Sequence, residues 1–189
     1  MGSTRILLRR EMVLEPTRAP GPSARSGTSP AGSPAGVPRE GGLSVLMDNI
    51  RSAWNVGSIF RSADGFGFVH AYLCGITPTP EVVAVMKTSL GAEDSVPWSY
   101  HKDAVKLVKG LKKEGFRILA LEEDVRAISI NDSTSGEHEV LILGSEVTGV
   151  DPELLELCDD ILYIPMRGEK KSFNVAMAFS IAAYALTNG

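Results

Sequence analysis

Residues 139–166 read EVLILGSEVTGVDPELLELCDDILYIPM, a stretch in which two apolar runs flank a polar loop and a mixed segment. EVLILG predicts a buried strand over 139–144 and ILYIPM a second strand over 161–166. Between them, DPELLELC predicts a helix over 151–158, with Asp151 as N-cap and Pro152 in the first helical position. A strand, a helix and a further apolar strand are typical of a parallel sheet covered by helices.

The same alternation continues through the rest of the chain. Apolar runs predict three more strands, over 43–48, 69–76 and 116–122. Apolar residues at helical spacing predict four more helices, over 54–66, 81–90, 101–115 and 172–186. The predicted fold class is therefore α/β, with a mostly parallel sheet and helices on both faces.

The N-terminal segment has a different texture. Residues 16–42 are dense in Pro, Gly, Ser and Ala, and such a composition buries too little apolar surface to offset its ordering entropy. We predict that residues 1–42 are a disordered tail or a remnant added by cloning, and that residues 43–189 form one folded domain. The arginines and serines of this segment also allow an organelle transit peptide, and a misplaced start codon would produce a similar extension.

The composition excludes several classes of protein. Of the 189 residues, 43% are hydrophobic and 22% charged, and no apolar run approaches the roughly 20 residues that span a membrane. We therefore expect a soluble, cytoplasmic protein without a membrane partner, organelle targeting aside. Cys74 and Cys158 are too few for a disulfide framework, and the scattered histidines and cysteines lack metal-ligand spacing, so no metal is expected.

The charge is unevenly distributed. Residues 1–42 hold six arginines and three glutamates, a net charge of +3, so the formal net charge of −4 leaves −7 on residues 43–189. An acidic body does not predict general affinity for nucleic acid. Any RNA contact must then come from a local basic patch, from the tail, or from both.

Ligands of parallel sheets bind beyond the carboxyl ends of the strands, so the loops after Asp48, Leu121, Gly144 and Ile164 are the candidate site. In the first loop and the helix after it, Ser52 or Asn55 could cap the helix. Gly57 costs about 0.5–1 kcal/mol in a helix relative to Ala, which suggests close approach of another backbone or of a phosphate. Arg61 lies one turn further, where it could bind an anion or form a surface ion pair.

Two later segments carry further polar residues. In LILGSEVTGV (141–150), Gly144 and Gly149 let the backbone approach a ligand, while Glu146 between them could also be a solvated loop residue. In YIPMRGEKKSFNVAMAFSIAAY (163–184), Ser172 could be the N-cap of the last helix. A capping serine would not explain Asn174, because a better helix former is expected at that position.

The order and spacing of the three segments are specific. N-x-G-x-x-x-R, G-x-E-x-x-G and I-P-M-x-G-x-x-x-S-x-N-V, taken together, resemble the SpoU/TrmH branch of the SPOUT RNA methyltransferases over about residues 43–186. The resemblance implies an enzyme that transfers a methyl group from S-adenosylmethionine to a ribose 2′-hydroxyl of tRNA or rRNA. It also implies a catalytic domain with a C-terminal trefoil knot, which is rare among folds, and a homodimer.

The resemblance assigns two sets of site residues. The catalytic positions are Asn55, Arg61, Glu146, Ser172 and Asn174. The cofactor pocket is expected around Leu121, Gly144, Ile164, Met166 and Phe173. Two positions depart from the usual pattern, since Phe173 replaces a leucine and Ala176 a serine. Phe173 keeps the pocket apolar, so cofactor binding is expected to survive.

Two other functions fit these patterns less well. A nicotinamide-dependent oxidoreductase would carry G-x-G-x-x-G directly after the first strand, whereas Gly65 and Gly67 follow a predicted helix. A catalytically silent RNA-binding or assembly factor with the same fold is the second alternative. The complete set of catalytic positions favours the enzyme. Which RNA it modifies does not follow from the sequence.

Overall fold

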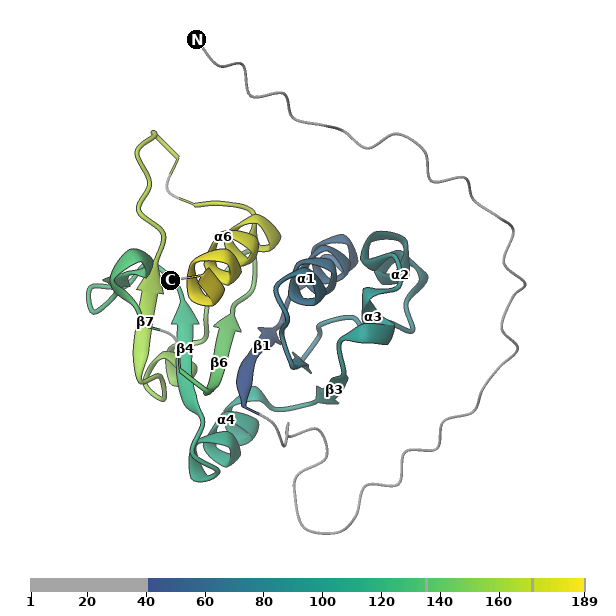
Figure 1. Cartoon of the computed structure of the whole chain (residues 1–189), viewed down its shortest axis with the longest axis horizontal. Coiled ribbons are helices and arrows are strands. Elements are labelled where there is room, and N and C mark those ends of the chain that lie inside the picture. Colours follow the sequence, from purple (N-terminus) through teal and green to yellow (C-terminus); the bar gives the residue numbers. More distant parts are fainter. Residues whose placement is uncertain (1–40, 135, 171, 189) are drawn as a thin grey trace. The chain divides into compact units, whose positions relative to one another are not determined.

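The computed structural model describes residues 41–134, 136–170 and 172–188, so almost all of the predicted tail over 1–42 lies outside the described residues. Within this part, seven strands form one sheet in the order β3-β2-β1-β6-β4-β7-β5, and all of their pairings are parallel (Figure 1). The strands are β1 (Gly42–Asp48), β2 (His70–Cys74), β3 (Trp98–His101), β4 (Arg117–Leu121), β5 (Ile128–Ser129), β6 (His138–Leu143) and β7 (Asp160–Tyr163). The prediction of a parallel sheet is confirmed.

Helices cover both faces of the sheet, as predicted. The helices α1 (Ala53–Gly65), α2 (Val83–Ser89), α3 (Ala92–Ser95) and α6 (Val175–Asn188) pack on one face, and α4 (Ala104–Lys113) and α5 (Pro152–Leu155) on the other. Side chains of β1 alternate between the two cores: Val45 and Met47 join the first and Leu46 the second. A short 3₁₀ helix, η1 (Ile130–Asp132), follows β5.

Every strand and helix predicted from periodicity is present, with bounds within three residues of those expected. Asp151 caps α5 as predicted, because its side chain accepts a hydrogen bond from the Glu153 N–H. At α1 the N-cap is Ser52 rather than Asn55. Strands β3 and β5 were not predicted, because they lie at the two edges of the sheet and are too short and too exposed to show an apolar run.

The strand order brings distant segments together. β6 lies between β1 and β4, and β7 lies between β4 and β5, so the loops after β4, β6 and β7 leave the sheet side by side. Leu121 pairs with Leu162, and Met47 with Leu143, near the carboxyl ends of these strands. The trefoil knot stays a prediction. No helix of the described part is long and apolar enough to cross a membrane.

Gly57 permits a close contact between two helices. A Cβ atom at Gly57 would lie 2.9 Å from the Ser89 nitrogen and would also overlap the Val85 carbonyl oxygen and the Thr88 hydroxyl. The backbone of α2 therefore packs directly on α1 at this point. Gly57 was predicted to face either another backbone or a phosphate. The structure shows the backbone of α2 on the side where a Cβ atom would point.

Candidate active site

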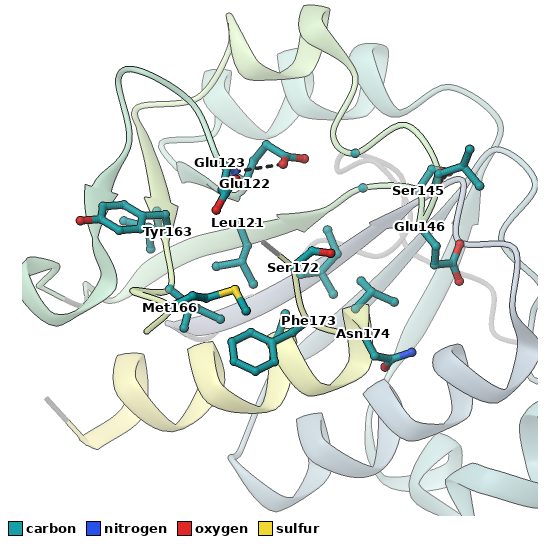
Figure 2. Close-up of a pocket in the computed structure, with 18 residues that line it drawn as sticks. Leu121, Glu122, Glu123, Ser145, Glu146, Tyr163, Met166, Ser172, Phe173 and Asn174 are labelled. Atoms are coloured by element: carbon teal, nitrogen blue, oxygen red, sulfur yellow. Dashed lines mark hydrogen bonds between the residues drawn. The ribbon is translucent and has the colours of Figure 1, made fainter. Parts of the chain in front are cut away.

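A cavity of about 440 Å³ opens at the carboxyl ends of β4, β6 and β7, within the size range of small-molecule sites (Figure 2). Residues 121–123 after β4, residues 143–147 and 149 after β6, and residues between 162 and 178 after β7 line it. These are three of the four loops in which the sequence predicted a ligand site. The site therefore lies where parallel sheets commonly bind ligands.

All five residues predicted to bind the cofactor line this cavity: Leu121, Gly144, Ile164, Met166 and Phe173. Figure 2 shows Met166 and Phe173 on the same side of the cavity. This apolar wall suits an adenine ring, and the Glu146 carboxylate that also lines the cavity suits a positively charged sulfonium. The residues present therefore fit S-adenosylmethionine.

Glu146 is the centre of a hydrogen-bond network at one end of the cavity. Its carboxylate accepts bonds from the Arg51 N–H at 2.9 Å, from the Ser52 N–H at 3.2 Å and from the Asn55 side chain at 2.8 Å. Burial raises the pKa of Glu146, whereas these hydrogen bonds lower it, and the net pKa lies below its usual value of 4.5. Glu146 is therefore an ionised acceptor that joins the loop after β6 to the start of α1.

Asn174 extends the network to the last helix. Its Nδ2 donates to the Asn55 Oδ1 at 3.1 Å, and its Oδ1 accepts from the backbone N–H groups of Ala176 and Met177 at the start of α6. The N-cap of α6 is thus Asn174, not Ser172 as one reading of the sequence had it. Asn174 is a poor helix former, but it lies at the capping position, where asparagine is favourable.

The glycine loop after β6 closes on itself. Gly149 has φ +72° and its N–H bonds to the Ser145 carbonyl at 2.9 Å. A Cβ atom at Gly144 would overlap the backbone of Gly149 and Val150. The two glycines are therefore needed for packing within the loop, although both also line the cavity as expected.

The structure brings four of the five predicted catalytic residues together. Glu146, Ser172 and Asn174 line the cavity, and Asn55 bonds to two of them. Ser172 is exposed at the cavity wall and takes no part in the network described above.

Arg61 lies apart from this group. It is exposed, six residues after Asn55 on α1, which is about 9 Å along a helix axis. It borders a separate hollow formed with Asp64, Ser95 and residues 89–92. Within the described part of the chain, its guanidinium has no hydrogen bond or ion pair.

Several residues of the cavity were not predicted from the sequence. Glu122 accepts a hydrogen bond from the Val150 N–H at 2.9 Å, and Glu123, Ser145, Val147 and Tyr163 also line the cavity. A signal for Glu122 was present, because a carboxylate directly after a buried strand lies at the ligand-binding edge of a parallel sheet. The other four lie within two residues of predicted site residues, and no pattern in the sequence distinguishes them from their neighbours.

Comparisons with known proteins agree with the family that the motifs resemble. The family model described as the SpoU rRNA Methylase family matches residues 42–184. The tRNA (guanosine(18)-2′-O)-methyltransferase of Thermus thermophilus is 32% identical over 148 residues, which cover 77% of this chain and 74% of that protein.

Two solved structures are similar in fold and sequence. The TrmH/SpoU tRNA modifying enzyme of A. aeolicus matches with a TM-score of 0.69 and 26% identity, over 76% of this chain and 72% of that one. The SpoU methyltransferase AviRb of Streptomyces viridochromogenes, in complex with its cofactor AdoMet, matches with a TM-score of 0.70 and 27% identity, over 78% and 60%. From the family match, the relative's identity and the geometry of the cavity, this chain belongs to the SpoU methylase family.

Proposed function

We propose that this chain transfers the methyl group of S-adenosylmethionine to a ribose 2′-hydroxyl of tRNA or rRNA. The observation that carries the proposal is the junction of two features at one sheet edge. An apolar cavity that fits the cofactor meets a polar network of Glu146, Asn55 and Asn174 at its end. The cofactor and a hydroxyl to be methylated would meet at this junction.

The network supplies orientation. Bound S-adenosylmethionine supplies a methyl carbon that is already electrophilic. The ribose hydroxyl must be held in line with that carbon and must lose its proton as it attacks, and such positioning supplies much of the acceleration. Glu146 fixes Asn55, and Asn55 fixes Asn174. Asn174 and the exposed hydroxyl of Ser172 are the polar groups that would orient the ribose.

Arg61 is assigned to the RNA backbone. A guanidinium presents five N–H donors and no acceptor, so Arg61 is assigned the role of a hydrogen-bond donor rather than that of a base. Its planar fork matches a phosphate. Because Arg61 lies apart from the network of Glu146, its charge would reach the developing alkoxide only where the bound RNA or a second copy of the chain brings the two together. Exposure and the lack of a partner among the described residues leave Arg61 available for this contact.

We also propose a homodimer, which the exposed apolar face of α6 supports. Met177, Ile181 and Tyr184 are 60%, 37% and 63% exposed, and their spacing of four and three residues places them on one helix face. The neighbouring α1, which lies beside α6 in Figure 1, exposes Trp54 and Arg61 seven residues apart on one stripe. A second copy docked on this surface would bury its apolar area and would decide what Arg61 contacts.

The test uses total tRNA and total rRNA with S-adenosylmethionine that carries a labelled methyl group. Label on a ribose 2′-oxygen, mapped to one nucleotide, supports the proposal and identifies the substrate. The alternative, a catalytically silent RNA-binding factor, predicts RNA binding without transfer of label. That outcome, in a preparation that binds S-adenosylmethionine by calorimetry, would overturn the enzymatic assignment.

A further inference from the structure

Glu122 lines the cavity but takes no part in the network of Glu146. It is the first residue after β4, and its carboxylate is held by two backbone groups. Oε2 accepts from the Val150 N–H at 2.9 Å, and Oε1 accepts from the Glu123 N–H at 3.0 Å. A carboxylate oxygen has two acceptor positions. Each oxygen therefore keeps a second position available to a ligand in the cavity.

The loop after β6 leaves space for this carboxylate. Gly149 adopts φ +72°, and a Cβ atom there would lie 3.1 Å from Glu122 Cδ and overlap Glu122 Oε2. Any larger residue at Gly149 would displace the Glu122 side chain. The Glu122 carboxylate is thus oriented on one side by the backbone and left open on the other.

We propose that Glu122 binds the ribose of S-adenosylmethionine by accepting hydrogen bonds from its 2′- and 3′-hydroxyls, an inference that rests on the proposed function. The two oxygens of a fixed carboxylate match two adjacent hydroxyls. An acidic side chain beyond a parallel strand recognises ribose hydroxyls in the same way in dinucleotide-binding folds. Glu122 is thereby a cofactor-binding residue outside the motifs that defined the site.

The position of Glu122 separates binding from chemistry. Figure 2 shows Glu122 across the cavity from Phe173 and away from Asn174, which belongs to the catalytic network. Loss of the Glu122 carboxylate should therefore raise the Kd and the KM for the cofactor. The kcat at saturating cofactor should stay close to that of the wild type.

The experiment measures calorimetric Kd values for the full chain and for Glu122→Ala. The ligands are S-adenosylhomocysteine, 5′-methylthioadenosine, which lacks the amino-acid part, and the 2′-deoxy and 3′-deoxy forms of each. We expect Glu122→Ala to raise the Kd of S-adenosylhomocysteine and that of 5′-methylthioadenosine by the same factor, about ten- to a hundredfold. Removal of a ribose hydroxyl should weaken binding to the wild type and have almost no effect on binding to Glu122→Ala.

Two results would overturn the inference. If 5′-methylthioadenosine bound both proteins equally while S-adenosylhomocysteine was weakened, Glu122 would contact the amino-acid part instead. If the deoxy ligands lost as much affinity for Glu122→Ala as for the wild type, the carboxylate would only hold the loop at Val150. The loss of affinity on removing a ribose hydroxyl is measured within one protein, so a change in the stability of Glu122→Ala does not affect that comparison.

Glu123→Ala is the matched control. Glu123 is adjacent, lines the same cavity and carries the same charge, but its carboxylate has no hydrogen bond within the described residues. Its removal should change the Kd of S-adenosylhomocysteine by no more than about twofold, the range of an exposed charge. Failure of the wild type to bind any of these ligands would instead overturn the cofactor assignment, and with it the proposed function.

Discussion

The side-chain amide of Asn174 donates a 3.1 Å hydrogen bond to that of Asn55, across 119 positions of sequence. The direction of this bond is set by its neighbours. Glu146 can only accept, so the Asn55 NH₂ group faces Glu146 and its oxygen faces Asn174. The Asn174 oxygen is then left to cap α6. The ionised carboxylate thus orients both amides, and the network loses its order if any one group is changed.

Asn174→Asp should separate capping from catalysis. Aspartate still accepts hydrogen bonds at the start of α6, and its charge is favourable at a helix N-terminus, so the Tm should be maintained. It cannot donate to Asn55, so methyl transfer should fall about 100-fold through loss of orientation. Methylation rates and thermal unfolding measure the two effects. Full activity of Asn174→Asp would show that the Asn55–Asn174 hydrogen bond is not needed for methyl transfer. Asn174→Ala removes the cap as well, so its free energy of unfolding should in addition fall by about 1 kcal/mol.

The stability that Glu146 contributes should depend on pH. Since the pKa of Glu146 is lowered in the folded chain, its contribution is complete above the usual value of 4.5 and is lost as the pH falls through the lower, folded value. Glu146→Gln removes this ionisation. The difference in unfolding free energy between wild type and variant should be about 1 kcal/mol at neutral pH and should shrink below pH 4.5. Denaturant titrations across this range measure it, and a difference that grew with acidity would contradict the assigned network.

Arg61→Ala should lower the rate of methyl transfer at least about 100-fold, while cofactor binding persists. The free energy of unfolding should change by no more than about 0.5 kcal/mol, because Arg61 is exposed and has no partner among the described residues. Arg61→Lys keeps the charge but loses the bidentate geometry, so intermediate activity is expected. Methylation assays and calorimetry with S-adenosylmethionine check both statements. Near-normal turnover by Arg61→Ala would exclude Arg61 from the active site.

Gly57→Ala and Gly110→Ala form a matched pair of helix substitutions. At Gly57 the added methyl group meets the backbone of α2, so we expect a loss of about 1–3 kcal/mol from overpacking. At Gly110, inside α4, it meets nothing within 4 Å, so we expect a gain of about 0.5–1 kcal/mol. Chemical denaturation measures both values. Equal effects at the two positions would show that α1 and α2 are not in close contact.

Met177→Glu should dissociate the proposed homodimer, because it places a charge within the exposed apolar stripe of α6. Sedimentation velocity should show a shift from dimer to monomer. Val125→Glu is the control, since Val125 is fully exposed and lies outside α1 and α6. A dimer that survived Met177→Glu would place the interface elsewhere.

Much of the fold and of the cavity was predictable from the sequence alone. Central strands such as 43–48 and 139–144 are buried on both faces, so their apolar runs are continuous and visible. Four of the five cofactor residues lie at fixed offsets within the motifs, Leu121 lies at the end of a predicted strand, and all five line one cavity. These features depend on neighbours along the chain. Local pattern therefore determined the α/β class and the bounds of most elements, while the family resemblance identified part of the cavity lining.

Tertiary structure decided what depends on contacts between distant residues. The insertion of β6 between β1 and β4 brings Glu146 beside Asn55, and no local pattern encodes that order. The same arrangement assigned the cap of α6 to Asn174, gave Gly57 a helix as its neighbour, and left Arg61 on an exposed face. Sequence identified the residues because chemistry restricts their type, whereas their partners follow from the packing of elements separated by many residues in the chain.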